Sequence, residues 1–126
     1  MNQEMEQVLK LDNEKKYEYF IKKIADFEEV WSLKDAEGWA SLGDNDKIYF
    51  PVWATKEYAD LCISEEWEGY ESGSIYLPDF LEKWLPGLKK DEIRITVMWH
   101  KGKGIDVDWD TLLEDIEAEL EEYEAE

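Results

Sequence analysis

Cysteine and long apolar runs are nearly absent from this sequence. Cys62 is the single cysteine in 126 residues, so no disulfide can form within the chain. The sequence has no N-terminal apolar run of the length that a signal peptide or a membrane span needs. Both features indicate a reducing, cytoplasmic setting. A basic neighbourhood that would stabilise a thiolate is absent near Cys62, so we interpret it as a small buried side chain on a helix face.

Positive charge is also scarce. The chain has 14 lysine and arginine residues, of which only Arg94 is an arginine, against 33 acidic residues, and its net charge is −19. Such a balance argues against nucleic acid or an anionic membrane as a partner, because both are bound by neutralising phosphates. Two interpretations remain: the charge only keeps the protein soluble, or it presents an acidic surface to a basic protein partner.

Motifs for catalysis or for a cofactor are missing. His100 is the single histidine, and a pair with Cys62 is conceivable, although a residue at the edge of a loop is the simpler interpretation. The run Gly102-Lys103-Gly104 lacks the flanking pattern of a phosphate-binding loop and is better interpreted as a hairpin turn. We therefore predict no catalytic residues and no cofactor.

A metal site is not predicted either. Asp106, Asp108 and Asp110 alternate, and Glu117 stands where the twelfth position of a calcium loop would fall. Thr111 occupies the sixth position, where such a loop needs glycine for its sharp turn. Acids at a strand-to-helix junction are more simply a helix cap with charges that complement the helix dipole. The shorter run at 44–46 has no downstream glutamate to complete it.

The residues that are present suffice for one folded unit. Apolar residues make up 44% of the chain and aromatic residues 14%, so large side chains are available for a core despite the charge. We expect a flexible or partly helical lead-in over residues 1–12 and a single α+β domain over residues 13–126.

Residues 47–62 form the unit around which we organise the prediction. Ile48 to Phe50 favour a strand, which should end at Pro51 or lie at a sheet edge because proline cannot donate to a ladder. Thr55 stands at an N-cap position, where its hydroxyl can accept from the first helical turn. Tyr58, Leu61 and Cys62 then follow helical spacing and should pack this helix on the sheet that contains Ile48.

Apolar spacing and turn residues predict the remaining elements. Asn13 is the candidate cap of the helix over residues 13–28 and Asp108 that of the last helix. The apolar stripe of the helix over residues 13–28 consists of Tyr17, Phe20, Ile21, Ile24 and Phe27. In the strand over residues 92–99, one face should be core and the other partly covered or solvated, because apolar residues alternate at Ile93, Ile95, Val97 and Trp99. Gly43 to Asp46 supply a hairpin turn, residues 64–74 are expected to be a loop, and Pro86-Gly87 should stop or bend its helix. The pattern predicts helices over residues 13–28 and from positions 56, 78 and 108, and strands over residues 30–33, 38–42, 48–50, 74–77, 92–99 and 105–107. We therefore predict an α+β fold of about five strands in a mostly antiparallel or mixed sheet with four packed helices, in which the strands of Ile48 and Ile95 are central or nearly so.

Aromatic residues supply the candidate binding site. The chain has seven tryptophans, and Trp39, Trp53, Trp67 and Tyr70 lie at predicted strand ends or in loops rather than within an apolar stripe. Most tryptophans in such positions cover the ends of a core. If the chain has a binding face, exposed aromatic rings beside acids should form it, because aromatic residues dominate the energetics of interfaces.

Several stretches together resemble a bacterial family known as domain of unknown function 2750. They include residues 17–21, 30–33, 37–40, 50–53 and 80–88, and the resemblance covers roughly residues 14–123. It implies a small cytoplasmic bacterial protein with no assigned activity and no catalytic residues to carry over. The unit around Pro51 is also similar, more loosely, to the N-terminal part of a secretion-associated enhancer-protein family found near toxin and immunity systems.

The sequence thus predicts a non-enzymatic protein-binding or regulatory module, with an immunity-type role among the options. An alternative is a small-ligand-binding protein or an enzyme with a pocket lined by Trp39, Trp53, Trp67 and Tyr70. A monomer and a homodimer are both compatible with the sequence.

Overall fold

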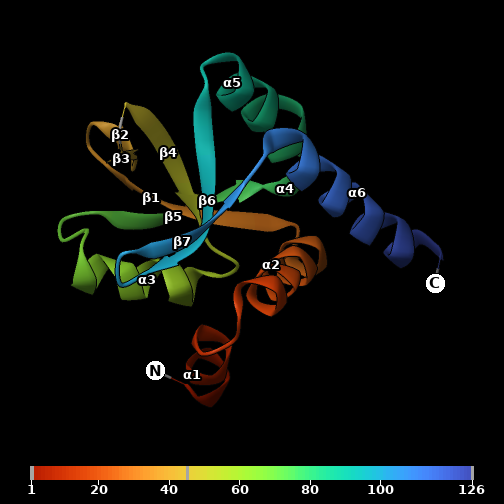
Figure 1. Ribbon diagram of the computed structural model, residues 1–126, viewed down its shortest axis with the longest axis horizontal. Coiled ribbons are helices and arrows are strands. Elements are labelled where there is room, and N and C mark those ends of the chain that lie inside the picture. The colour runs from red at the N-terminus through yellow and green to blue at the C-terminus, as the bar shows by residue number, and fades with distance from the viewer. Residues whose placement is uncertain (1, 45, 126) are drawn as a thin grey trace.

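Two β-sheets that meet at one point form the centre of the protein, as Figure 1 shows for the computed structural model, which describes residues 2–44 and 46–125. One sheet has three antiparallel strands, and the other has four strands of which one neighbouring pair is parallel. In spatial order the strands are β2 (Gly38–Trp39), β1 (Glu29–Asp35) and β5 (Glu71–Tyr76), and then β3 (Leu42–Asp44), β4 (Lys47–Val52), β6 (Ile93–His100) and β7 (Lys103–Val107).

The sheets are joined where β4 ends beside β1. The backbone N–H of Trp31 donates to the carbonyl of Trp53 at 3.1 Å, and the N–H of Trp53 donates to the carbonyl of Trp31 at 2.8 Å. The buried hydroxyl of Ser32 donates to the carbonyl of Pro51 at 2.7 Å. These bonds satisfy the backbone at the junction, so both sheets can share one core.

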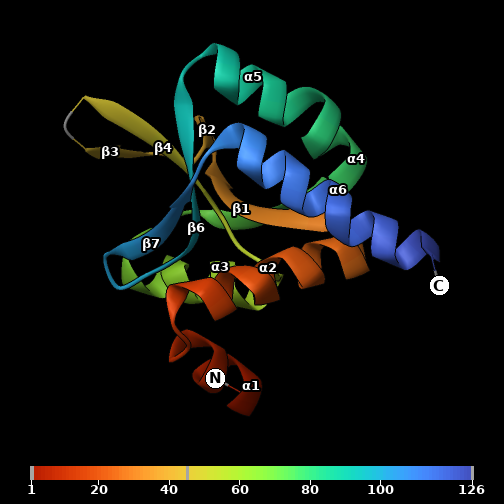
Figure 2. The ribbon, with the colours of Figure 1, turned by 45° about the vertical axis from the view of Figure 1, so that its right-hand side comes forward.

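Helices cover the sheets from several sides (Figures 1 and 2). Helices α2 and α6 lie side by side and are linked by a hydrogen bond of 2.6 Å, which the hydroxyl of Tyr17 in α2 donates to Asp115 of α6. Helix α3 lies mainly on β5 and β1. The helical segments are α1 (Gln3–Leu9), α2 (Asn13–Phe27), α3 (Lys56–Glu65), the continuous segment α4 (Leu77–Asp79), η1 (Phe80–Trp84) and α5 (Leu85–Lys90), and α6 (Trp109–Ala125).

The predicted α+β class is confirmed, but the strand count differs. The expected strand over residues 38–42 is two strands that belong to different sheets, since Trp39 pairs with Lys34 of β1 whereas Leu42 pairs with Tyr49 of β4. Residues 43–46 were expected to form the hairpin turn before β4, but Gly43 and Asp44 belong to β3 and pair with β4, and Asn45 lies outside the described residues. The strands of Ile48 and Ile95 are β4 and β6, which are the two inner strands of the four-stranded sheet, as predicted.

The unit at residues 47–62 is a strand followed by a helix, with three corrections. The strand passes through Pro51 to Val52, because the partner strand β3 ends opposite Tyr49 and leaves that side of β4 unpaired at the proline. The helix begins after Thr55, yet the threonine hydroxyl makes no capping hydrogen bond. The helix α3 was expected on the sheet that contains Ile48, but it packs mainly on β5 and β1 of the other sheet, with a smaller contact to β6 of the sheet of Ile48, and Ile48 is 49% exposed.

Other element ends also differ from the predictions. Helix α2 is capped by Asp12 rather than by Asn13, since Oδ1 of Asp12 accepts a hydrogen bond from the N–H of Lys15 at 2.9 Å. The helix after Pro78 does not stop at Leu85, because it continues through the π-helical turn over Phe80–Trp84 to Lys90.

Strand β5 begins three residues before the predicted start, inside the expected loop. The ring of Trp39 lies so close to Gly73 that a Cβ at this position would be only 3.1 Å from it, so a residue without a side chain fits here best. The close approach of Trp39 therefore explains why a glycine in this strand is compatible with pairing.

Strand β6 contains a bulge next to its end. Its pairing with β7 shifts between Val97 and His100, and Met98 has a positive φ of 55°. Ile95 to Met98 are all buried, so the expected alternation of a covered and a partly solvated face fails in the middle of the strand.

Candidate functional site

The four aromatic residues that were predicted to bind differ in burial, and none of them is among the lining residues of the two cavities described below. Trp53 is 1% exposed and Trp67 is buried, and their rings meet edge to face with centroids 5.9 Å apart. Trp39 is partly buried elsewhere, with its ring centroid 5.2 Å from that of Trp84. Tyr70 is partly buried as well. Their binding role stays a prediction, and Trp39 and Tyr70 are the more exposed of the four.

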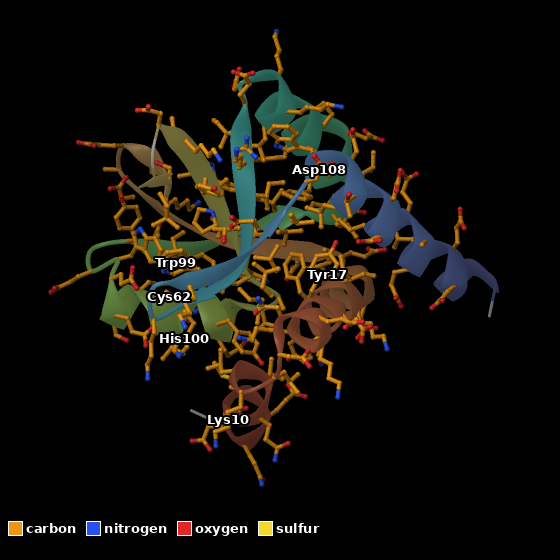
Figure 3. All side chains as sticks on the ribbon, in the orientation of Figure 1. Lys10, Tyr17, Cys62, Trp99, His100 and Asp108 are labelled. Carbon is orange, nitrogen blue, oxygen red and sulfur yellow. The ribbon has the colours of Figure 1, made fainter. Side chains whose placement is uncertain are left out.

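Cys62 contacts a backbone carbonyl in a buried setting. Its thiol donates to the carbonyl of Trp99 at 3.1 Å, and the indole N–H of Trp53 donates to the same oxygen at 2.9 Å. His100 is the next residue in the chain, and its Nδ1 lies 3.2 Å from Oε1 of Glu65 (Figure 3 labels Cys62, Trp99 and His100). The bulge in β6 thus presents a carbonyl that two side chains satisfy, and the thiol has a structural role.

Burial raises the pKa of the Cys62 thiol to about 12, with a smaller contribution from the charges of Glu65 and Glu66. We expect a thiol-reactive disulfide reagent at pH 8 to leave the native protein unmodified and to react in urea, because only the thiolate is nucleophilic. The pKa of the Cys62 thiol in the folded protein lies above the unfolded value of 9.0. The buried neutral thiol therefore makes its full contribution to the free energy of unfolding below pH 9, and this contribution is lost as the pH rises toward 12. Rapid labelling of folded protein at pH 8 would contradict this assignment.

The alternating acids after β7 serve the start of α6. Oδ2 of Asp108 accepts from the N–H groups of Asp110 at 3.1 Å and Thr111 at 3.3 Å, so the predicted cap is confirmed. The carboxylate of Asp110 pairs with Lys89 at 2.9 Å. Within residues 2–44 and 46–125, no three histidine, cysteine or acidic side chains gather as a metal site would require.

A cavity of about 450 Å³ lies where α1, α2, β1 and the start of α3 meet. We name it the aromatic pocket. Four rings and three carboxylates line it together with two lysines, and the rings come from α2, β1 and α3. These residues are Tyr19, Phe27, Trp31 and Tyr58, then Glu4, Glu29 and Glu57, and finally Lys23 and Lys56.

Hydrogen bonds fix the inner wall of the aromatic pocket. The hydroxyl of Tyr58 donates to that of Tyr19 at 3.1 Å, which in turn donates to Oε2 of Glu4 at 3.1 Å. The two tyrosine rings meet edge to face with centroids 5.9 Å apart. Burial raises the pKa of both phenols, so both stay neutral at physiological pH and continue to donate.

A cation of the chain itself already lies against the rings. The ammonium nitrogen of Lys23 is 5.4 Å from the ring centroid of Tyr19 and 5.6 Å from that of Phe27. Both distances fall within the range of cation–π contacts. The phenyl ring of Phe27 is 55% exposed, so its outer part remains accessible.

Sequence reasoning missed this pocket because it placed Phe27 in the buried stripe of α2. The stripe interpretation is correct for Phe20, Ile21 and Ile24, which are buried. Phe27 is the last residue of the helix and precedes Glu28, whose left-handed backbone turns the chain into β1. The position of Phe27 at the very end of the apolar stripe was the one sequence feature that could have indicated an exposed ring.

A family model described as protein of unknown function (DUF2750) matches residues 17–116, which is more than half of the chain. The chain belongs to the DUF2750 family. This match confirms the resemblance seen in the sequence. The matched residues of this DUF2750 protein include all four rings of the aromatic pocket but not α1. No curated protein matches the chain.

In the described part of this DUF2750 protein, none of the helices combines the length and the apolar character that crossing a bilayer would demand. The longest helix, α6, carries acidic residues along most of its length.

Proposed function

We propose that this DUF2750 protein is a non-enzymatic binding module of the cytoplasm that takes a lysine or arginine side chain of a basic protein partner into its aromatic pocket. The observation that carries this proposal is the position of Lys23 over Tyr19 and Phe27. Aromatic rings attract cations because their faces carry negative charge density. A pair of rings that holds one ammonium group has the geometry to hold another in its place.

The carboxylates of the pocket support the same ligand class. Glu29 and Glu57 line the cavity beside the rings, and Glu4 is held there by the hydroxyl of Tyr19. A lysine side chain buries an apolar stem against rings while its three N–H donors reach acceptors. The combination of ring faces with carboxylate oxygens therefore suits a long cationic side chain better than an apolar one.

The charge of the whole protein favours the encounter with such a partner. The net charge is −19. Exposed acids lie along α6, and the C-terminal half of this helix projects from the body (Figures 1 and 2). A field of one sign attracts oppositely charged partners over distances of about a Debye length, about 8 Å at physiological salt. We therefore expect the association rate with a basic partner to fall steeply as the salt concentration rises.

Phe27→Ala tests the pocket directly. We expect it to weaken the binding of a capped tetralysine peptide, measured by isothermal titration calorimetry, by between about twofold and about thirtyfold, which corresponds to the loss of one cation–π contact. Tyr76→Ala is the matched control, because Tyr76 is 56% exposed but lies outside the pocket. Its peptide affinity should stay that of the parent protein.

A second pair of variants separates the pocket from the overall field. Lys23→Gln removes the internal cation and should strengthen peptide binding more than Lys22→Gln, which changes the net charge equally from an exposed position on the same helix. Equal affinities for the Phe27 and Tyr76 variants, or equal effects of the two lysine variants, would reduce the interaction to nonspecific attraction and refute the proposed site.

A further inference from the structure

A larger concavity, of about 860 Å³, lies away from the aromatic pocket. Its walls are the first turn of α2, the β3–β4 hairpin and the β6–β7 hairpin, and Figure 2 shows both hairpins projecting on one side with the start of α2 below them. We name it the lysine groove. The residues on which its chemistry depends are Lys16, Lys101 and Lys103, with Tyr49, Thr96 and Trp99.

The charge of the lysine groove is opposite to that of the protein. Lys16, Lys101 and Lys103 line it, whereas Asp106 is the one acid among its lining residues in the described part of the chain. Within the same described residues, none of these three lysines forms an ion pair, although the chain has 33 acids. Three unpaired ammonium groups around one concavity leave a local positive potential that an anion would neutralise.

The floor of the groove contains a polar group without a partner. Thr96 is 1% exposed, and its hydroxyl has no hydrogen-bond partner in the described part of the protein. This hydroxyl lies against the backbone of Gly104, where the absence of a side chain makes room for it. Buried hydroxyls nearly always have a partner, so an unpartnered one at the floor of a concavity points to an acceptor or donor supplied from outside.

We propose that the lysine groove binds a small phosphate-bearing molecule with a planar ring, such as a nucleoside monophosphate, whose phosphate lies between Lys16 and Lys103. A phosphate monoester carries a charge of about −1.5 to −2 at pH 7 and three acceptor oxygens, which suits several ammonium groups better than a single carboxylate does. Tyr49 and Trp99 are partly buried in the wall and supply ring surfaces for a planar group.

The size of the ligand follows from volume and charge. A concavity of this volume lies in the range of small-molecule sites. A nucleic acid would extend beyond the groove over a surface whose acids outnumber its bases, and that surface would repel it. A short molecule with one phosphate gains the local attraction without this repulsion.

The site is independent of the proposed function. The lysine groove and the aromatic pocket share no lining residue. The tetralysine peptide and the phosphate ligand should therefore bind without competing, and failure at one site leaves the other in place.

Titration of the full chain with adenosine monophosphate and with inorganic phosphate tests the proposal. We expect saturable binding of adenosine monophosphate by calorimetry, tighter than that of inorganic phosphate, with NMR shifts concentrated on the amides of Lys103, Gly104 and Trp99. Lys16→Gln and Lys103→Gln should each weaken this binding by about threefold to tenfold, as expected for the loss of one charge pair in a partly exposed site.

Lys22→Gln is the matched control, since it removes the same charge from α2 outside the groove and should change the affinity by less than about 1.5-fold. Three results would overturn the proposal: no saturable binding of adenosine monophosphate, an affinity no better than that of inorganic phosphate, or an equal effect of the Lys16 and Lys22 variants. Tighter binding of a single-stranded oligonucleotide than of the mononucleotide would also overturn it, because the ligand would then be a polymer.

Discussion

Trp53→Ala is expected to lower the free energy of unfolding by about 3–5 kcal/mol, the range for truncating a fully buried large aromatic side chain. Trp53 is 1% exposed, and its ring packs edge to face against Trp67. Its backbone also forms the two hydrogen bonds with Trp31 that join the sheets. Because single domains are stable by only about 5–15 kcal/mol, this variant should unfold at much lower urea concentrations than the parent protein.

Urea unfolding followed by far-ultraviolet circular dichroism measures the effect without depending on tryptophan fluorescence. Trp53→Phe is the informative companion, since it keeps most of the ring but loses the N–H that donates to the carbonyl of Trp99 at 2.9 Å. That carbonyl still accepts from Cys62, so we expect a smaller loss of about 1–3 kcal/mol. A Trp53→Ala protein with a midpoint near that of the parent would show that the two sheets do not depend on this side chain.

Local pattern was sufficient for the elements in which each residue contacts its near neighbours in the sequence. The stripe of α2 predicted the burial of Phe20, Ile21 and Ile24, and Asp108 was identified as the cap of α6. These predictions rest on the helical repeat and on hydrogen bonds to the next turn, both of which depend on adjacent residues alone.

Features that depend on distant residues could not be derived in the same way. The stretch after Gly38 divides between two sheets because its partners, Lys34 and Tyr49, lie on different strands. Both faces of β6 are buried from Ile95 to Met98, and Gly73 pairs in β5 where the ring of Trp39 covers it. Period and propensity report whether a segment suits a strand, but they do not identify its neighbours.

The same limit applies to the candidate sites. The aromatic pocket takes Tyr19, Trp31 and Tyr58 from three elements, and the lysine groove brings Lys16 beside the hairpin that carries Lys103. Composition pointed to acids and aromatic residues, and side chains of both kinds line the aromatic pocket, although none of the four aromatic residues singled out from the sequence is among them. A local excess of positive charge was hidden in the composition, because a net charge of −19 averages over the whole chain.

Gly104→Ala is expected to destabilise the protein by about 1–3 kcal/mol through overpacking. A Cβ at this position would overlap Oγ1 of Thr96 and would stand 3.0 Å from Cε3 of Trp99. Thr96 is 1% exposed in the middle of β6, which is paired on both sides, so little free space is available for its hydroxyl to move into. Gly43→Ala is the matched control, because a Cβ at this other strand glycine meets no atom within 4 Å.

Removal of the Thr96 hydroxyl should restore part of the stability that Gly104→Ala loses. Thr96→Ala alone eliminates a buried hydroxyl that has no partner among the described residues, and we expect it to change stability by less than about 1 kcal/mol because the lost packing is offset by the lost desolvation cost. In a double-mutant cycle measured by urea unfolding, Thr96→Ala should recover about 1–2 kcal/mol of the loss caused by Gly104→Ala. Additive effects, or equal losses for alanine at positions 43 and 104, would mean that the backbone of Gly104 and the hydroxyl of Thr96 are not in contact, and the floor of the lysine groove would then lack its polar group.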